Sequence, residues 1–360
     1  IRQMNLRFWK NKRVLITGHT GFKGSWLTLI LSCLGSKVAG YALNPISKPN
    51  FFDSVNLKKF LVKDFRHDIL DYKKLNMAIK IFKPEIIFHF AAQSSVLESY
   101  KSPKATINVN VMGTINILEA AKLNKYTKSI VITTTDKVYL NMERKIPFIE
   151  NDSLGGHDVY SGSKAATEIV TQSYKRSFLG NSKCNVATVR SGNCIGGGDW
   201  TKDRIVKDCA ESFLKNKKII IRSPRATRPW QHVLEPLFGY IKLSEKLYKS
   251  KKFEGSWNFG PRIKNNLKVI DVVKFGKNFM KSKSKIIIKK NKYYESTNLS
   301  LNSNKSLKQL NWKTLMNAKQ ALRLSFEWYK FYDKNFSNVA IVNFTLEQIN
   351  NYKKIVKSSI

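Results

Sequence analysis

A tyrosine and a lysine stand four residues apart in the segment Tyr160-Ser161-Gly162-Ser163-Lys164. On a helix, residues at this spacing lie on one face, so the ammonium group can come near the phenol. A nearby ammonium group favours the phenolate and lowers the pKa of a tyrosine from its usual value of ~10. Such a tyrosine can take a proton from an alcohol while a hydride leaves the same carbon. The same spacing also occurs by chance in many helices.

A second polar cluster, Thr135-Asp136-Lys137, follows the apolar run Ser129–Thr133, which reads as a strand. Thr135 can hydrogen-bond a substrate hydroxyl beside Tyr160. Asp136 and Lys137 form an acid and a base whose charges can tune each other's pKa. A helix cap followed by a surface lysine is the other interpretation, and the cluster taken alone favours it.

Three glycines, Gly18, Gly21 and Gly24, lie between the first apolar run and the first helical pattern, with Phe22 among them. Glycines let a chain turn tightly and let a pyrophosphate approach the amides at a helix N-terminus. This loop therefore indicates a dinucleotide site, with a plain structural turn as the alternative. An acidic residue for the adenosine ribose is expected about 20 residues later, but Asn44 stands there. NAD and NADP both remain open at this point, although no arginine follows that strand.

Two further segments are candidates for cofactor contacts. Asp68 and Ile69 follow a predicted strand and could hold the adenine edge, although Asp68 could equally cap the next helix. Ala91-Ala92-Gln93 ends the apolar run Glu85–Phe90, at the sheet edge where α/β proteins bind their ligands.

These candidates sit among alternating strands and helices. Such alternation predicts an α/β fold with a doubly wound parallel sheet. Expected strands are Arg13–Thr17, Lys37–Leu43, Glu85–Phe90, Ser129–Thr133 and Asn185–Arg190, and expected helices are Gly24–Leu34, Asp71–Phe82, Thr106–Leu123 and Tyr160–Phe178. After residue 190 the pattern loosens. We therefore expect a dinucleotide-binding domain over residues 1–190 and a smaller α/β substrate domain over 191–360, with the segment near 230–260 as a candidate to return to the first.

The chain of 360 residues carries 64 Lys+Arg against 25 Asp+Glu, a formal net charge of +39. Its hydrophobic fraction of 42% excludes a disordered basic tail as the main identity. The charge invites an anionic partner, and nucleic acid, acidic membrane and phosphorylated small molecules all qualify. Because the basic residues are spread over the whole chain, we favour a charged surface over a nucleic-acid site.

The four cysteines have no CxxC spacing and no histidine cluster beside them, which argues against a zinc site and a disulfide framework. The first twelve residues are polar and basic and lack the apolar core of a secretory signal. The apolar run Trp26–Leu34 is too short to span a bilayer. We therefore expect a soluble cytoplasmic protein without metal and without membrane contact.

The glycine loop, the Tyr160/Lys164 pair and the order of elements together resemble the extended short-chain dehydrogenase/reductase family. Within it, several longer blocks resemble nucleotide-sugar 4,6-dehydratases of the CDP-glucose group. Lys137, where other nucleotide-sugar dehydratases have Glu, is itself typical of that group. The blocks are GHTGFKGSWL from Gly18, TTDKVY from Thr134, LGGHDVYSGSK from Leu154, GNCIGGGDW from Gly192, RPWQHVLEP from Arg228 and WNFGP from Trp257.

This resemblance implies an NAD-binding Rossmann fold and a hydro-lyase acting on CDP-glucose. Tyr160, helped by Lys164 and Thr135, would deprotonate the sugar 4-hydroxyl while NAD takes the hydride. Asp136 would protonate the leaving 6-hydroxyl, and Lys137 would help remove the C5 proton.

The resemblance also implies that Asn193, Arg204 and Arg228 bind the substrate. It implies a homodimer, or a dimer of dimers, built on the helices over residues 106–123 and 160–178. Another nucleotide-sugar dehydratase or epimerase remains an alternative reading, as does a nucleic-acid-binding protein on the same fold.

Overall fold

The computed structural model describes residues 6–262, 266–289, 298–335 and 337–358. Residues 1–5 of the basic N-terminal segment therefore lie outside the described residues. Within the described ranges, no helix is long and apolar enough to cross a membrane.

A seven-stranded parallel sheet forms the centre of the molecule, in the order β11-β6-β5-β4-β1-β2-β3. Its strands are β1 (Arg13–Thr17), β2 (Lys37–Tyr41), β3 (Lys63–Phe65), β4 (Ile86–His89), β5 (Ser129–Thr133), β6 (Asn185–Ser191) and β11 (Gly255–Phe259). The chain runs outward from β1 to β3 and then crosses to β4 on the other side of β1. That reversal opens a crevice at the carboxyl ends of β1 and β4, where α/β sheets bind ligands. The expected α/β fold class is confirmed.

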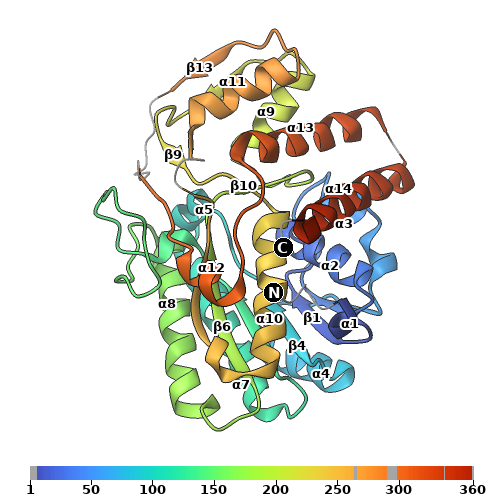
Figure 1. Ribbon diagram of the computed structural model, residues 1–360, viewed down its shortest axis with the longest axis vertical. Helices are drawn as coiled ribbons and strands as arrows, with labels where there is room; N and C mark the ends of the chain where they lie inside the picture. Colours follow the sequence, from blue (N-terminus) through green and yellow to red (C-terminus); the bar gives the residue numbers. More distant parts are fainter. Residues whose placement is uncertain (1–5, 263–265, 290–297, 336, 359–360) are drawn as a thin grey trace.

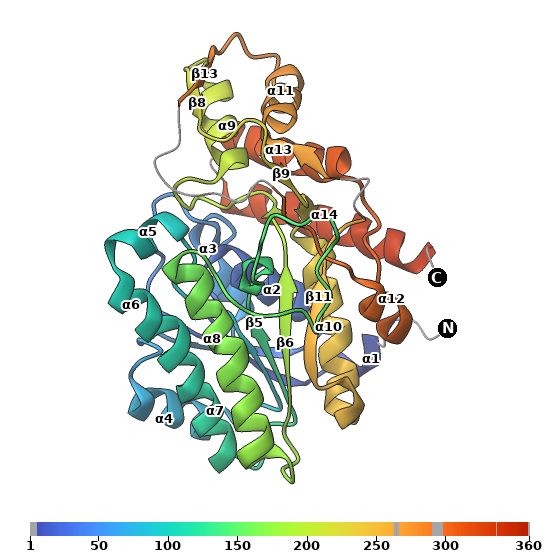
Figure 2. The ribbon, with the colours of Figure 1, turned by 90° about the vertical axis from the view of Figure 1, so that its left-hand side faces the viewer.

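Helices cover both faces of the sheet, as the apolar strands require. On β1, Val14 and Ile16 enter one buried cluster and Leu15 enters the other. Figure 2 shows α7 and α8 on one side of β5 and β6, and α10 on the other. The first face carries α4 (Tyr72–Phe82), α6 (Pro103–Ile107), the π-helical turn η2 (Asn108–Met112), α7 (Gly113–Leu123), α8 (Val159–Tyr174) and the π-helical turn η4 (Lys175–Leu179); the second carries α1 (Leu6–Trp9), α2 (Phe22–Cys33) and α10 (Leu234–Lys249).

A smaller unit lies beyond the carboxyl edge of the sheet, where Figure 1 shows α9, α11 and α13 gathered together. It contains α9 (Ile205–Leu214), β8 (Ile219–Ile221), β9 (Thr227–Arg228), β12 (Leu267–Lys268), α11 (Val269–Phe279), β13 (Ile286–Ile288) and α13 (Ala318–Lys334). The remaining short elements are α3 (Phe51–Ser54), η1 (Leu57–Phe60), α5 (Val96–Lys101), η3 (Asp136–Val138), β7 (Cys194–Ile195), β10 (Gln231–His232), η5 (Lys251–Phe253) and α12 (Asn304–Leu310).

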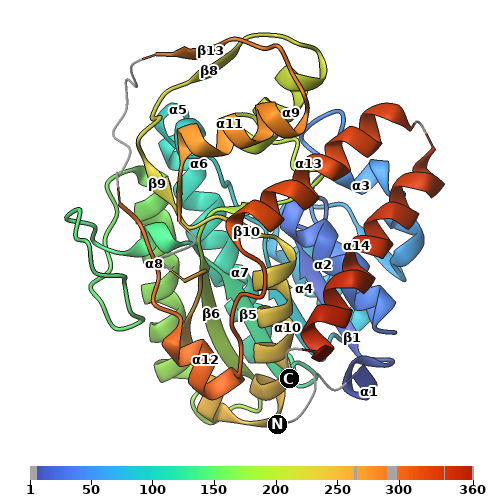
Figure 3. The ribbon, with the colours of Figure 1, turned by 45° about the horizontal axis from the view of Figure 1, so that its top comes forward.

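The C-terminal helix α14 (Asn338–Ser358) follows α13 and packs against it and against α3, as Figure 3 shows. Its Tyr352 donates a hydrogen bond of 2.6 Å to the buried carboxylate of Glu235 on α10. Trp328 of α13 donates to the Thr345 hydroxyl of α14 at 2.9 Å. This last helix is therefore fixed to the body of the protein.

The element boundaries differ from the expectations in a few places. The helix expected over Thr106–Leu123 begins at Pro103 and is interrupted by the π-helical turn η2. After residue 190 the chain returns to the sheet, because α10 packs on β5 and β6 and β11 pairs with β6. A division of the chain at residue 190, with 230–260 returning, remains our proposal for the domains.

Candidate active site

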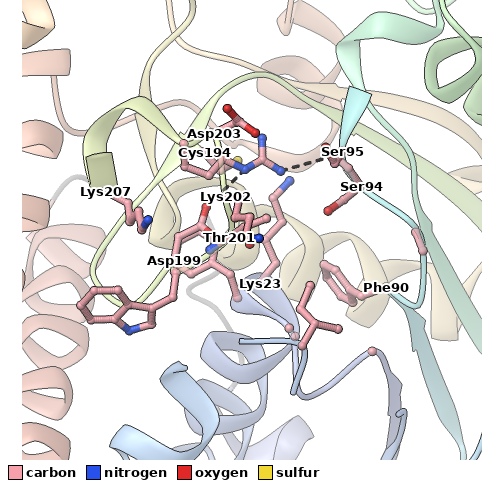
Figure 4. A pocket seen from close by; sticks show the side chains of 18 of the residues that line it. Lys23, Phe90, Ser94, Ser95, Cys194, Asp199, Thr201, Lys202, Asp203 and Lys207 are labelled. Atoms are coloured by element: carbon pink, nitrogen blue, oxygen red, sulfur yellow. Dashed lines mark hydrogen bonds and ion pairs between the residues drawn. The ribbon is translucent and has the colours of Figure 1, made fainter. Parts of the chain in front are cut away.

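One large cavity, of about 610 Å³, opens at the carboxyl edge of the sheet and is bounded on its far side by the smaller unit. Figure 4 shows Lys23 and Phe90 on the side of the sheet, with Asp199, Thr201, Lys202 and Asp203 on the loop that faces them. The cavity is lined by residues of both the glycine loop and the Thr135-Asp136-Lys137 cluster, together with Tyr160 and Lys164. The structure thus brings three separate sequence motifs to one place.

The glycine loop connects β1 to α2, and its backbone packs so closely that two of its glycines leave no room for a side chain. Gly18 has φ of +73°, and a Cβ atom there would lie 2.7 Å from the backbone nitrogen of Ala91 at the end of β4. A Cβ on Gly24 would lie 2.3 Å from the carbonyl oxygen of Gly18. Because side chains are excluded here, a diphosphate can approach the first amides of α2, which begins at Phe22. The loop therefore fits a dinucleotide.

Most of the other expected cofactor residues line the same cavity, namely Asn44, Asp68, Ile69, Ala91 and Ala92. Asp68 does not cap the following helix. That helix, α4, is capped by Asp71, whose side chain accepts from Lys74 N, whereas Asp68 accepts from Leu70 N.

Gln93 does not reach the cavity wall; its side-chain amide donates to the Ser95 carbonyl and to the Thr106 hydroxyl, so it braces the loop instead. Arg66, at the end of the neighbouring strand, donates to the Leu43 carbonyl and pairs with Asp64. The sequence analysis looked for an arginine only just after β2, and it therefore missed Arg66, which follows β3.

Tyr160 and Lys164 lie on the buried face of the first two turns of α8. Asp158 caps this helix by accepting from Ser161 N. One turn after Lys164, the buried Glu168 accepts two hydrogen bonds from Arg190 of β6, at 2.9 and 3.0 Å. This ion pair, which the sequence analysis missed, fixes the face of α8 that carries Tyr160 and Lys164 against the sheet. The sequence could have indicated a buried partner for Glu168, because this residue lies four positions after Lys164, on the same face of the helix.

The expected lowering of the Tyr160 pKa is wrong for the protein without ligands. Burial raises the pKa of Tyr160 to about 12, although a hydrogen bond with Thr135 partly opposes the shift. The physical reason is the burial of the phenol, which disfavours its charged form, while Lys164 donates its hydrogen bond to the carbonyl oxygen of Thr133, at 3.1 Å. Burial, together with the charge of Lys23, lowers the pKa of Lys164 to about 8.

Asp136 is the buried acid of the site, with 3% of its surface exposed. Burial raises its pKa, against the opposing effect of the Lys137 charge. Thr135 donates to its Oδ1 at 3.1 Å, while Oδ2 is buried and has no hydrogen-bond partner among the described residues. A carboxyl group that resists ionisation and has an unpaired oxygen can donate a proton to a bound substrate. The alternative of a helix cap with a surface lysine holds in part, because Thr135 caps the short helix η3 by accepting from Lys137 N at 3.4 Å, but Lys137 is half-buried and a cap accounts for neither feature of Asp136.

Lys23 is a second residue that the sequence analysis did not single out. It stands in the first turn of α2, reaches across the cavity and donates to the Ser191 hydroxyl at the end of β6, at 3.1 Å. Its charge acts on both Lys164 and Asp136. The segment of the glycine loop thus contributes its backbone amides and also the cation of Lys23, which lies at the end of the cavity that holds Lys164 and Asp136.

The three expected substrate residues line the cavity on the side of the smaller unit. Arg228 on β9 is buried and donates to the Thr227 carbonyl at 3.0 Å. Arg204 precedes α9, half exposed, with its Nε 3.7 Å from an Asp199 oxygen. Asn193 stands in the turn after β6. Among the described residues, no group of three or more His, Cys, Asp or Glu side chains could hold a metal ion.

Comparison with known proteins places this constellation in a family. The profile of the GDP-mannose 4,6 dehydratase family matches residues 15–324. The chain belongs to this family of nucleotide-sugar dehydratases. It is 42% identical over 330 residues to the CDP-glucose 4,6-dehydratase of Salmonella typhimurium, a match that covers 90% of this chain and 92% of that protein. The expected family and the expected class of enzyme, a hydro-lyase, are thereby confirmed.

Solved structures share the fold at lower identity. A dTDP-glucose 4,6-dehydratase from Bacillus anthracis in complex with NAD is 20% identical with a TM-score of 0.73, over 89% of this chain and 96% of that one. A UDP-glucose 4-epimerase from Thermotoga maritima with UDP-glucose is 20% identical with a TM-score of 0.77, over 88% of this chain and 98% of that one. These likenesses confirm the Rossmann-type architecture, which dehydratases and epimerases share.

Proposed function

We propose that the enzyme converts CDP-glucose to CDP-4-dehydro-6-deoxyglucose and water, with NAD as its cofactor. The observation that carries the proposal is the buried acid Asp136, with its unpaired Oδ2, in the same cavity as Tyr160 and Lys164. The 42% identity to a CDP-glucose 4,6-dehydratase over most of both chains supports the choice of substrate. The glycine loop, closed to any side chain at Gly18 and Gly24, supports the dinucleotide.

NAD, held by the glycine loop at Gly18, Gly21 and Gly24, would supply the acceptor for the hydride on C4 of the sugar and the donor that returns it to C6, so that it would not be consumed. Tyr160 takes the proton of the 4-hydroxyl as that hydride leaves. The Tyr160 pKa of about 12 must fall for this step, and the ammonium group of Lys164 one helical turn away is the group that can lower it. Thr135 orients the same hydroxyl.

The 4-ketone acidifies the proton on C5. Lys137, half-buried in the cavity wall next to Asp136, removes that proton. The C6–O bond then breaks as Asp136 delivers its proton to the leaving oxygen, which departs as water. Lys137 returns its proton to C5 as C6 receives the hydride, and is thereby restored. Tyr160 then carries the proton of the 4-hydroxyl and Asp136 has lost one, so a proton must pass from Tyr160 to Asp136 before the next turnover. Thr135, which is hydrogen-bonded to both, is placed to pass it.

The reaction is tested by incubating the enzyme with NAD and, in separate reactions, CDP-, dTDP-, UDP- and GDP-sugars. We expect CDP-glucose to give a 4-keto product lighter by one water, detected by mass spectrometry. Failure to dehydrate any of the four sugars would sink the proposal. Dehydration of another nucleotide sugar in preference to CDP-glucose would overturn the choice of substrate.

A 4-epimerase of the same fold needs no acid to expel the 6-hydroxyl. The burial and raised pKa of Asp136 would then have no use, which is why we favour the dehydratase. Product analysis separates the two, because epimerisation leaves the mass unchanged.

The proposal extends to assembly and place. Several apolar side chains are exposed on the helices over residues 103–123 and 159–179: Ile107, Met112, Ile169 and Phe178. They support a homodimer built on these helices. We also propose that the enzyme is cytoplasmic and that its product feeds the synthesis of deoxysugars for surface polysaccharides such as O-antigen. Sedimentation equilibrium of the enzyme and of its Ile169→Lys variant tests the assembly. We expect a dimer and a weakened dimer, respectively, and a monomeric enzyme would contradict the proposal.

A further inference from the structure

An ion pair stands at the edge of the cavity that belongs to the smaller unit. Arg222, directly after β8, donates from Nη2 to Asp203 Oδ1 at 2.5 Å. Both residues line the cavity, and both side chains remain open, with 42% and 44% of their surfaces exposed. Within the described part of the chain, Asp203 Oδ2 has no hydrogen-bond partner. The pair therefore presents a donor edge and an acceptor oxygen side by side.

Asp203 adopts a conformation that few residues adopt. Its φ is +62°, in the left-handed region, which aspartate tolerates better than most side chains but still at a cost. Residues held in such regions often serve ligand binding. The loop thus holds the carboxylate of Asp203 against Arg222 despite the strain of its backbone.

The other ion pairs around the cavity are placed differently. Arg204 lies near enough to Tyr160 for its charge to favour the phenolate, so it belongs to the reacting end. Asp208 is paired at 3.5 Å with Lys207, whose side chain is mostly buried and also pairs with Glu211. The Arg222–Asp203 pair differs from both, because it joins the end of β8 to the loop before α9. Ile220, whose side chain is exposed, and Val269 line the same cavity.

This arrangement suits a flat heterocycle. The sugar must lie at Tyr160, so the nucleoside extends away from the sheet toward the smaller unit. Apolar side chains such as Ile220 and Val269 can cover the face of a base, while the ion pair meets its edge. Cytosine presents two acceptors, O2 and N3, next to an N4 amino donor. Uracil and thymine present the acceptor O4 in place of that donor, and carboxylates read cytosine through N4.

We infer that Arg222 and Asp203 together read the base of the substrate and select cytosine over uracil and thymine, an inference that rests on the proposed function. Arg222 donates to the O2 and N3 acceptors, and Asp203 Oδ2 accepts from the N4 amino group. A uracil or thymine O4 would face the carboxylate, so that two acceptors meet without a proton between them. Selection thus includes a repulsive element against the wrong base.

The test compares the binding of CDP and UDP by calorimetry, and kcat/KM for CDP-glucose and UDP-glucose, in the enzyme and in Asp203→Asn. The amide of asparagine can donate to O4, so the variant should lose the part of the discrimination that Asp203 supplies, while Arg222 still faces the N3–H donor of uracil. We expect the CDP/UDP preference to fall by about tenfold or more, in both affinity and kcat/KM, with UDP binding unchanged or improved.

Glu211→Gln is the matched control, because Glu211 pairs with Lys207, has 43% of its side chain exposed and does not line the cavity. It makes the same change of charge and should keep the preference. Asp203→Asn retaining the full preference would overturn the inference, and so would an equal loss for both nucleotides, which indicates a structural role. An enzyme that dehydrates no nucleotide sugar, yet binds CDP over UDP through Asp203, would refute only the proposed function.

Discussion

Lys164 donates a hydrogen bond from Nζ to the carbonyl oxygen of Thr133, 3.1 Å away, and so joins the buried face of α8 to the end of β5. The ammonium group is buried in this position and faces the charge of Lys23 from the glycine loop. Burial and Lys23 together lower the pKa of Lys164 to about 8. The protonated form, which favours the Tyr160 phenolate, is therefore lost just above neutral pH.

Replacing Lys23 with methionine should shift the pH profile of the reaction. Removing a nearby cation makes protonation of Lys164 easier, so the pKa of Lys164 rises toward its ordinary value. Activity of the parent enzyme should decline as pH rises through about 8, and the decline in Lys23→Met should occur at higher pH. The measurement is kcat/KM against pH. Lys202→Met removes another cavity lysine and should leave the position of the decline unchanged; a decline at the same or lower pH in Lys23→Met would contradict the prediction.

Asp136→Asn should block elimination more than the first oxidation. The amide cannot deliver a proton to the leaving oxygen, while Tyr160, Lys164 and Thr135 remain in place. We expect kcat for dehydration to fall by roughly a hundredfold or more, the usual contribution of a general acid. Single-turnover absorbance of the reduced nicotinamide follows the first step separately and should change much less. Normal dehydration by this variant, or an equal loss in both steps, would remove Asp136 from the role of acid.

The parts of the fold and site that the sequence predicted are those encoded locally. The glycine loop, the spacing of Tyr160 and Lys164 and the apolar strands each lie within a short segment, and they led to the parallel sheet and its ligand edge. The wrong prediction for the Tyr160 pKa has a different origin. Spacing places the ammonium group on the correct face, but it does not show how deeply the fold buries the phenol, and that burial raises the pKa.

The residues that were missed act through partners far away in the chain. Arg190 meets Glu168 across 22 residues, and Lys23 meets Ser191 across 168. Such pairs depend on how strands and helices pack, which no periodicity encodes. Gln93 was predicted to contact the cofactor because it stands at a strand end. Its side-chain amide instead donates to Ser95 O and to the Thr106 hydroxyl, so local contacts decided its role.

Gly18→Ala should weaken both the fold and NAD binding. A Cβ atom would lie 2.7 Å from Ala91 N, and the φ of +73° disfavours any L side chain. We expect a loss of about 1–3 kcal/mol in the free energy of unfolding, measured with urea, and weaker NAD binding by calorimetry. Gly162→Ala, in α8 with nothing within 4 Å of its added Cβ, should be neutral or stabilising. Equal effects of the two substitutions would show that Gly18 is not under steric constraint.

Glu235→Gln should change how stability depends on pH. Glu235 is fully buried, and burial raises its pKa from the ordinary 4.5 to about 7, opposed by its hydrogen bonds from Tyr352, Met316 N and Leu315 N. An acid whose pKa is raised in the folded state stabilises the fold fully below its unfolded pKa and loses that contribution as pH rises through the folded pKa.

The free energy of unfolding of the parent enzyme, relative to Glu235→Gln, should therefore fall between about pH 4.5 and 7, by up to about 3 kcal/mol. Glutamine cannot ionise, so it remains in the form that the buried site favours. Urea unfolding at several pH values measures this difference, and Glu211→Gln, which alters an exposed carboxylate, should show no comparable trend. A difference that stays constant or grows in the parent's favour across that range would mean that Glu235 is ionised throughout, held by Tyr352 and the two amides on the loop before α13.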